Sequence, residues 1–151
     1  MTKSQSGQTM VEFALVVGAF LLVTFAAVSA AFHSIQRAMA ETAAATGVQV
    51  AASGSPGDPN TPFMAGGFQP TENLLRSVMF GTVIDRMPAG QQCRPMDQIN
   101  QSHIQICIYP DGQLVGETVR GHPDFPIPWI TQYLPWSIDV TVEMHEVSFQ
   151  P

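Results

Sequence analysis

The hydrophobic pattern of the chain changes character near residue 53. From Phe13 to Phe32 the residues FALVVGAFLLVTFAAVSAAF are apolar or small and carry no charge. A helix of that length, at 1.5 Å per residue, spans about 30 Å, which is the hydrocarbon thickness of a bilayer. An apolar surface on every side is typical of a helix that faces lipid. The pattern therefore predicts a transmembrane helix over residues 13–32.

The next segment, residues 33–52, continues the helix beyond the bilayer. Its sequence, HSIQRAMAETAAATGVQVAA, is rich in alanine and lacks proline, so it favours helix in water. Small residues recur at four-residue spacing, as in Ala14 with Gly18 and Ala43 with Gly47. Such positions allow close helix packing, although alanine is also simply common in helices. We expect one helix over residues 8–52 that bundles with other helices.

A break in the pattern follows the helix. The stretch SGSPGDPNTP, residues 53–62, is dominated by proline and glycine, which end helices. It predicts a Pro/Gly-rich linker over residues 53–69. A short amphipathic helix is then expected over 70–81, with Thr71 as its N-cap and Gly81 as its stop.

Two-residue alternation marks the strands of the C-terminal part. In HIQICIYPDGQLVGETV, three isoleucines alternate with other residues, and Pro110–Gly112 indicates a turn before a second strand over 114–119. The stretch SIDVTVEMHEV, from Ser137, alternates in the same way and predicts a half-buried antiparallel strand. We therefore expect an α+β fold, in which residues 70–151 form a small antiparallel β-sheet domain with a short packing helix.

An aromatic, proline-rich segment lies between those strands. HPDFPIPWITQYLPW, residues 122–136, holds four prolines and two tryptophans, so it predicts a loop rather than a central strand. The loop either caps the core or presents its aromatic rings to a partner or an adhesion target.

Charge excludes one class of function. The net charge is -6, and residues 53–151 hold ten carboxylates against four arginines. A protein that binds a nucleic-acid backbone shows the opposite balance, so no nucleic-acid partner is expected.

Cys93 and Cys107 are the only cysteines. They suit one disulfide outside the cytoplasm or two reduced thiols inside it. Because Cys107 alternates away from the isoleucines of its strand, a bond to Cys93 would tether residues 94–102 across the other face of the sheet.

Candidate catalytic and metal-binding patterns are weak. Glu143 and His145 share one strand face, but the sequence offers no convergent third metal ligand, and it shows no phosphate loop or nucleophile motif. We expect no catalytic residue, no metal and no cofactor.

The apolar run allows three fates. A secretory signal peptide could be removed before Ala31, which follows the small residues VSA. A permanent single-pass anchor is a second possibility, with the N terminus weakly predicted inside because Lys3 and the terminal amine outweigh Arg37. The third fate depends on the residues that precede the run.

A short polar leader, MTKSQSG, is followed by QTMVEF, so that Glu12 and Phe13 stand fifth and sixth after Gly7. This arrangement resembles the processing site of type IV pilin-like precursors, in which a prepilin peptidase cuts after the glycine. The Glu–Phe pair is similar to the tight adherence (Tad, or Flp) branch. More narrowly, GQTMVEFALVVGAFLL, with the later AETAAATGVQVAA and SIDVTVEMHEV, resembles the TadE-like pseudopilins.

The resemblance implies a structural role and a set of partners. Residues 1–7 would be a leader, cut between Gly7 and Gln8, and the helix would anchor the precursor in the cytoplasmic membrane with its N terminus inside and its C-terminal domain outside. The partners implied are the prepilin peptidase, membrane lipid, copies of itself or other pilins in an extracellular filament, and an inner-membrane assembly platform. The alternative function is an anchored or secreted binding domain that does not polymerise.

A role for Glu12 follows from the cut. Cleavage creates an α-amine at Gln8, one helical turn or about 6 Å from Glu12 along the helix axis. An unpaired carboxylate near mid-bilayer costs about 2.5–3.5 kcal/mol on insertion scales. A neighbouring subunit's Gln8 amine would therefore be a suitable partner for Glu12. The alternative is a carboxylate that reaches the membrane interface and needs no partner.

Overall fold

The computed structural model describes residues 5–53, 62–79, 81–112, 114–124 and 136–145, with only the backbone described for residues 5–8 and 62–65. Within these ranges lie helices α1 (Gln5–Ala52) and α2 (Pro62–Val78) and a short 3-10 helix, η1 (Met96–Gln98). The strands are β1 (Val83–Arg86), β2 (His103–Asp111), β3 (Leu114–Gly121) and β4 (Ile138–His145). The chain divides into two compact units, residues 1–35 and 36–151.

The α+β class is confirmed, including the long N-terminal helix. Helix α1 has 48 residues and begins at Gln5, three residues before the predicted start. It is free of proline and continues to the Pro/Gly-rich break after Ala52, as the sequence predicted. The break itself, residues 54–61, lies outside the described residues.

The sheet has the order β1-β2-β3-β4. Strands β2 and β3 form the predicted antiparallel hairpin, in which Ile106 pairs with Val119, and β3 pairs with the predicted strand β4 in antiparallel fashion. The hairpin turn lies slightly later than expected, because Pro110 and Asp111 still belong to β2. Gly112 has a positive φ of 64°, a conformation that suits glycine at a tight turn.

One strand was not predicted, and it changes the sheet from antiparallel to mixed. Strand β1 runs parallel to β2, with Val83 opposite His103. Its four residues, VIDR, are too few to show a clear alternation of apolar and polar positions. A parallel neighbour also requires a crossover connection, which here is the segment 87–102.

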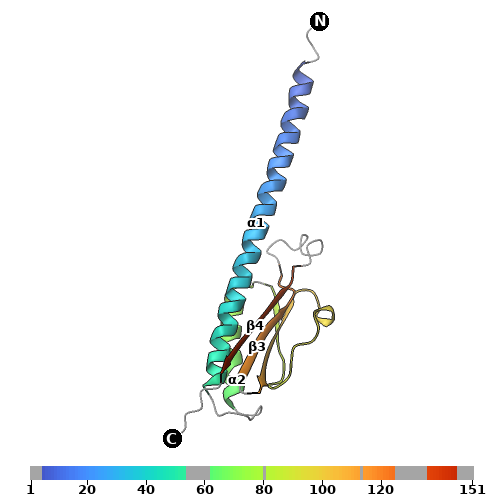
Figure 1. Ribbon diagram of the computed structural model, residues 1–151. Coiled ribbons are helices and arrows are strands. Elements are labelled where there is room, and N and C mark those ends of the chain that lie inside the picture. The colour runs from blue at the N-terminus through green and yellow to red at the C-terminus, as the bar shows by residue number, and fades with distance from the viewer. Residues whose placement is uncertain (1–4, 54–61, 80, 113, 125–135, 146–151) are drawn as a thin grey trace. The chain divides into compact units, whose positions relative to one another are not determined.

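Both helices of the C-terminal unit cover one face of this sheet (Figure 1). The hydrophobic core combines α2, the residues of α1 from Ala40 to Ala52 and the inward-facing residues of the strands. The fully buried isoleucines 104, 106 and 108 lie at its centre, as their alternation predicted. The residues of β4 become less buried along the strand, from Ile138 at 1% exposed to Met144 at 40%.

Helix α2 begins earlier than the sequence predicted, and this corrects two expectations. Residues 62–69 were expected in a linker, but they form the first part of the helix. Pro62 occupies its first position, where the missing N–H costs nothing, and Pro70 lies inside it. Thr71 is therefore not an N-cap: it is a fully buried residue in the middle of α2.

The disulfide between Cys93 and Cys107 is present, with a Cα–Cα distance of 5.4 Å. Cys107 belongs to β2 and points away from the core face, so the bond holds the crossover on the opposite face of the sheet. The backbone N–H of Arg94 also donates to Gln105 Oε1 at 3.0 Å. The predicted tether across the outer face is thus observed, and the element that it fixes is the β1–β2 crossover.

A buried carboxylate joins α2 to β1. Glu72 is 8% exposed and forms ion pairs with Arg76, at 2.7 Å, and with Arg86 of β1. Arg86 also donates to Gln69 Oε1 at 3.1 Å. Burial by itself raises the pKa of Glu72, but the hydrogen bonds and charges of Arg76 and Arg86 outweigh it and lower the pKa below 4.5. The two arginines therefore keep Glu72 in its charged form. In that form, its ion pair with Arg86 holds α2 against the edge strand β1.

Replacing Glu72 by glutamine is expected to lower the free energy of unfolding by about 1 kcal/mol at pH 7, because two arginines lose their charged partner. A carboxyl with a lowered folded-state pKa stabilises the fold above its unfolded-state pKa, and this contribution is lost as the pH falls through the folded-state value. The difference between the two proteins should therefore shrink below about pH 4.5. Urea titration at several pH values measures it. Glu41→Gln, which disrupts the exposed Arg37–Glu41 pair, is the control and should change little at any pH.

Candidate functional site

The N-terminal unit exposes an apolar surface around the whole circumference of α1. Every residue from Thr9 to Val28 is exposed, and large hydrophobic side chains dominate, including Phe13 at 70%, Phe20 at 68% and Leu22 at 74%. Among the described residues, α1 is the one helix that is long and apolar enough to cross a membrane. Such a surface is unfavourable in water and needs lipid or other helices to cover it.

Two hydroxyl groups of α1 form hydrogen bonds within the helix itself. The Thr24 hydroxyl donates to the carbonyl of Phe20 at 2.8 Å, and the Ser34 hydroxyl donates to that of Ala30 at 2.9 Å. In hydrocarbon, a hydroxyl group without a hydrogen-bond partner is unfavourable by roughly several kcal/mol of free energy. These internal hydrogen bonds make the Thr24 and Ser34 hydroxyls compatible with an apolar environment.

The predicted processing motif lies at the start of α1. Gly7 and Gln8 are in the first turns of the helix, and Glu12 and Phe13 follow one turn later with exposed side chains. The helical path puts Gln8 and Glu12 about 6 Å apart along the axis. The predicted pairing of a Gln8 α-amine with the Glu12 carboxylate was based on this axial spacing.

In the C-terminal unit, α1 presents a stripe of small residues to the sheet and to α2. The buried positions recur at helical spacing: Gln36, Ala40, Ala43, Ala44, Gly47, Val48, Ala51 and Ala52. At Gly67 of α2, an added Cβ would lie only 2.8 Å from the carbonyl oxygen of Gly47. The two helices therefore approach through glycine, and the sheet packs close behind them.

A glutamate is buried where these elements meet. Glu117 of β3 is 0% exposed, and its Oε1 lies 2.5 Å from Thr71 Oγ1 of α2. A Cβ added at Gly47 would overlap Thr71 Oγ1 and Glu117 Oε2, so α1, α2 and β3 are all in contact at this carboxyl. Desolvation by burial raises the pKa of Glu117 to about 8, and the hydrogen bond with Thr71 opposes this only in part. The carboxyl is therefore mostly protonated at neutral pH.

Sequence reasoning placed Glu117 in a strand but missed its burial. The signal was present in β3, where Val115, Glu117 and Val119 alternate on one face, so the glutamate shares the core-facing side with two valines. An acidic residue on the apolar face of a strand is uncommon unless it is paired or neutral.

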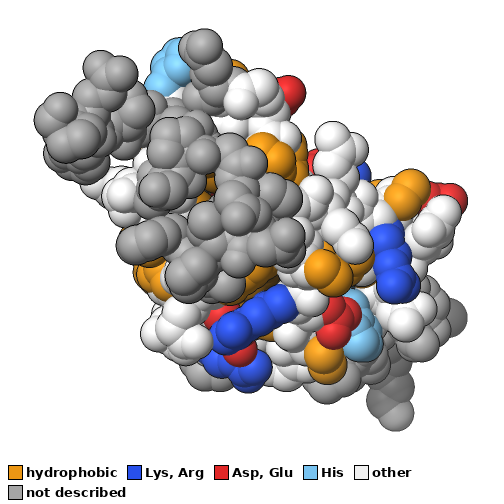
Figure 2. Space-filling model, turned by 90° about the horizontal axis from the view of Figure 1, so that it is seen from below, with side chains coloured by type: hydrophobic (Ala, Val, Ile, Leu, Met, Phe, Trp, Pro, Cys, Tyr) orange, Lys and Arg blue, Asp and Glu red, His pale blue; other side chains and the backbone are white. Residues whose placement is uncertain are grey.

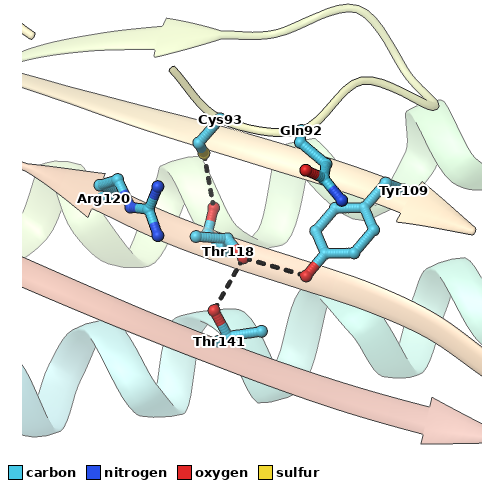
Figure 3. Close-up of a pocket in the computed structure, with 6 residues that line it drawn as sticks. All are labelled: Gln92, Cys93, Tyr109, Thr118, Arg120 and Thr141. Carbon is cyan, nitrogen blue, oxygen red and sulfur yellow. Dashed lines mark hydrogen bonds between the residues drawn. The ribbon is translucent and has the colours of Figure 1, made fainter. Parts of the chain in front are cut away.

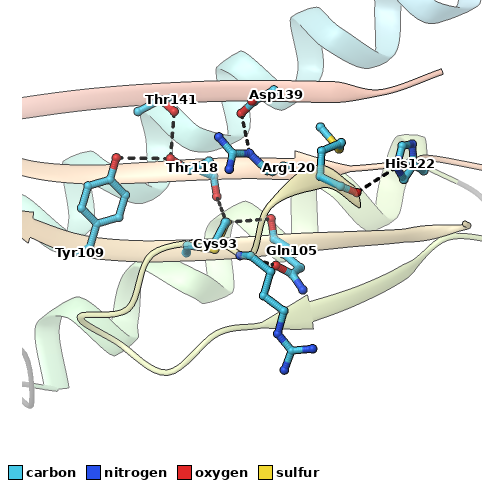
Figure 4. A network of polar contacts seen from close by, with 11 residues as sticks. Cys93, Gln105, Tyr109, Thr118, Arg120, His122, Asp139 and Thr141 are labelled. Atoms are coloured by element: carbon cyan, nitrogen blue, oxygen red, sulfur yellow. Dashed lines mark hydrogen bonds and ion pairs between the residues drawn. A yellow bond between two sulfur atoms is a disulfide. The ribbon is translucent and has the colours of Figure 1, made fainter. Parts of the chain in front are cut away.

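The outer face of the sheet carries a polar network (Figure 4). Thr118 Oγ1 is hydrogen-bonded to Thr141 Oγ1 at 2.9 Å and to the Tyr109 hydroxyl at 3.4 Å. Arg120 donates to Asp139 at 3.0 Å. These cross-strand contacts tie β2, β3 and β4 together on the side opposite the helices.

A small polar depression of about 130 Å³ lies on this face, next to the disulfide (Figure 3). Three of its lining side chains, those of Tyr109, Thr118 and Thr141, are hydrogen-bonded in a row, and Arg120 is paired with Asp139 beside them. The lining residues are Gln92, Cys93, Tyr109, Thr118, Arg120 and Thr141. The depression has the dimensions of a few water molecules rather than of a substrate.

No strong single-sign charge surface is visible on the face shown in Figure 2, where basic side chains lie beside acidic ones. Glu143 and His145 are both exposed on β4. Among the described residues, no group of three or more His, Cys, Asp or Glu side chains could hold a metal ion. The aromatic segment of residues 125–135, predicted to cap the core or contact a partner, lies outside the described residues.

The features of α1 now agree with a comparison against protein families. Residues 7–49 match the model of the family described as TadE-like protein. This part of the chain is TadE-like. The match begins at Gly7, the predicted cleavage residue, and ends three residues before the end of α1. The recognition made from GQTMVEFALVVGAFLL is confirmed.

The match covers the TadE-like segment and leaves the sheet domain unassigned. No curated protein and no solved structure matches the chain. The matched family is pilus-related and structural. The C-terminal domain must be understood from its own contacts.

Proposed function

We propose that the chain is a pseudopilin of a Tad-type pilus, cut by prepilin peptidase after Gly7 and assembled through its apolar N-terminal helix. One observation carries the proposal: the TadE-like match starts at Gly7 and covers the helix on which every residue from Thr9 to Val28 is exposed. A helix that is apolar all round and joined to a separate folded domain suits a subunit that exchanges lipid neighbours for helix neighbours.

Before assembly, the precursor spans the cytoplasmic membrane once, with its N terminus inside. Lys3 and the terminal amine lie before the apolar run, and Arg37 lies after it, which weakly favours this orientation. The C-terminal domain is then outside the cytoplasm, where disulfides persist. The Cys93–Cys107 bond supports this placement.

During assembly, Glu12 pairs with the new α-amine of Gln8 on a neighbouring subunit. The pair brings opposite charges together in the apolar interior of the helix bundle, where an isolated charge is costly: about 2.5–3.5 kcal/mol at the centre of a bilayer. Because the pair forms at one axial offset between adjacent helices, it sets the register of each incoming subunit. The partners are prepilin peptidase, other pilins, membrane lipid and an inner-membrane assembly platform, and the product is an extracellular filament that serves surface adherence.

The N terminus of the mature protein tests the processing step. We expect mass spectrometry of the protein from membranes and sheared filaments to show a chain that begins at Gln8. A chain that begins at Ala31 would instead establish a secreted protein, and one that begins at Met1 or Thr2 a permanent anchor. Either result would contradict the proposal and leave a binding domain that does not polymerise as the function.

Glu12→Ala tests the assembly step. We expect normal cleavage after Gly7 but at least a tenfold loss of the subunit from sheared filaments, because the Gln8 amine loses its partner at a cost of more than about 1.4 kcal/mol. The amounts of mature subunit in the membrane and filament fractions measure the effect. Glu41→Ala is the matched control, since Glu41 is an exposed carboxylate further along α1. Normal incorporation of Glu12→Ala would show that this carboxylate has no role in assembly.

A further inference from the structure

The most unusual group in the C-terminal domain is the fully buried carboxyl of Glu117, which contacts both helices through Gly47 and Thr71. We propose that Glu117 is a proton-controlled latch: its protonated carboxyl lets the Gln36–Ala52 part of α1 pack on the sheet, and loss of the proton releases that part. The latch goes beyond the pilin function and would operate whether or not the chain polymerises.

The hydrogen-bonding groups around Glu117 suit a neutral carboxyl and provide too few donors for a carboxylate. The Thr71 hydroxyl has one proton, yet three acceptors lie near it: Glu117 Oε1 at 2.5 Å and the carbonyl oxygens of Ala43 and Gly67, both at 3.2 Å. A protonated Glu117 can donate to Thr71 Oγ1, while Thr71 donates to one of the carbonyls. An ionised Glu117 would compete with both carbonyls for that single proton.

The second carboxyl oxygen strengthens this argument. Glu117 Oε2 is buried and has no hydrogen-bond donor within reach among the described protein atoms. It faces the backbone of α1 at Gly47, where there is no side chain to supply a donor. Of the described residues, only Thr71 would thus stabilise a negative charge divided between the two oxygens, and burying such a charge is strongly unfavourable.

In the part of the chain that the structure describes, no basic side chain faces the interior and is free to neutralise Glu117. Among the described residues of the Gln36–Ala52 part of α1, of α2 and of the four strands, the other buried charged side chain is Glu72, which pairs with Arg76 and with the partly exposed Arg86. The remaining charged groups of these elements are exposed, lie on the outer face or form their own ion pairs. They are Arg37 and Glu41 of α1, Arg76 of α2, Asp85 of β1, His103 and Asp111 of β2, Arg120 of β3, and Asp139, Glu143 and His145 of β4.

The α1 segment is the element that yields most easily when the carboxyl ionises. Glu117 belongs to β3, which is paired with β2 on one side and with β4 on the other, so Glu117 lies opposite Ile108 and Val142. Across from it, α1 contributes mainly alanine and glycine, which bury little apolar surface per residue. Separating α1 from the carboxyl would let water reach Oε2 while the sheet stays paired.

The direction of the pH effect follows from the raised folded-state pKa of about 8. Such a carboxyl stabilises the closed state fully below its pKa in the open state, about 4.5, and that stabilisation is lost as the pH rises toward 8. In that range the equilibrium constant for opening should rise about tenfold per pH unit, and above pH 8 it should level off.

Hydrogen exchange on the full chain in detergent tests the latch. Protection factors, which correct for the intrinsic pH dependence of exchange, are measured for amides 40–52 and for β2 and β3 between pH 5 and 9. We expect protection of amides 40–52 to fall about tenfold per pH unit up to pH 8, while protection of β2 and β3 changes much less. Glu117→Gln, a neutral isostere whose amide can donate to Thr71, should abolish this slope.

Two further variants keep the test decisive. Glu143→Gln removes an exposed carboxylate of the neighbouring strand and should retain the wild-type slope. If Glu117→Gln does not fold, Glu117→Met provides a second uncharged side chain of similar length. In that variant, too, protection of amides 40–52 should not change with pH. A slope that persists without Glu117 would overturn the proposal. So would an equal loss of protection in the sheet, since ionisation would then unfold the whole domain.

Discussion

Replacing Gly47 by alanine is expected to lower the free energy of unfolding of the C-terminal domain by about 1–2 kcal/mol, although alanine is the better helix former. The added methyl group would overlap Thr71 Oγ1 and Glu117 Oε2. All three residues are buried, so neither neighbour can move into solvent, and overpacking of a filled core typically costs about 1–3 kcal/mol. The gain in helix propensity, about 1 kcal/mol, offsets only part of such a cost when the overlap is severe.

Gly66→Ala is the matched control for this change. Gly66 is also helical, but an added Cβ there would meet only Val50 Cγ1, at an ordinary 3.8 Å. We expect this variant to be as stable as the wild type or up to about 1 kcal/mol more stable. Urea titration of the full chain in detergent, followed by tryptophan fluorescence, measures both variants.

A double-mutant cycle identifies the residue responsible. In a Glu117→Ala background one of the two overlapping groups is gone, so Gly47→Ala should cost clearly less than it does in the wild type. If Gly47→Ala were as harmless as Gly66→Ala, the close contact of α1, α2 and β3 at this point would be refuted.

Removing the Cys93–Cys107 disulfide is expected to cost about 3 kcal/mol. The bond closes a loop with a sequence separation of 14, and on the chain-entropy model a loop of this size contributes about that much by restricting the unfolded chain. This loop includes residues 93–102 of the crossover that allows β1 to pair in parallel with β2. Cys93→Ala/Cys107→Ala should therefore unfold at lower urea concentration, and β1 should lose protection from hydrogen exchange.

The control for the disulfide is reduction of the wild-type chain. Dithiothreitol should lower the stability of the wild type to near that of the double variant, and it should leave the variant unchanged. Mass measurement with and without alkylation shows whether the thiols have formed. Equal stability of the oxidised and reduced wild type would mean that the crossover is held by its other contacts, such as the Arg94–Gln105 hydrogen bond.

The hairpin and β4 could be predicted because their core-facing and outward-facing residues alternate cleanly. Ile104, Ile106 and Ile108 all lie on the core face. Because Cys107 alternates with them, its disulfide was predicted on the opposite face, where it is found. A two-residue period leaves no choice about which side chains share a face.

The misjudged elements are those in which local signals conflict with tertiary packing. Proline and glycine near residues 62–70 indicated a linker, yet Pro62 starts α2 and Gly67 lets it approach α1. Strand β1 has only four residues, ends at Arg86 and pairs with a strand that begins only at His103. Neither a close helix contact nor a parallel pairing leaves a periodic trace in a short window of sequence.

Two glutamates show the difference between what the sequence by itself determined and what only the tertiary structure decided. The role proposed for Glu12 is a prediction from the sequence alone, because it depends on covalent spacing: Glu12 lies five residues from Gly7, at the start of an uncharged run. Glu117 acquires its character from α1, α2 and β3 together, since only their packing removes water from the carboxyl and leaves Thr71 as its partner. Spacing along a helix is a local property of the chain, whereas desolvation depends on which distant residues fill the space around a group.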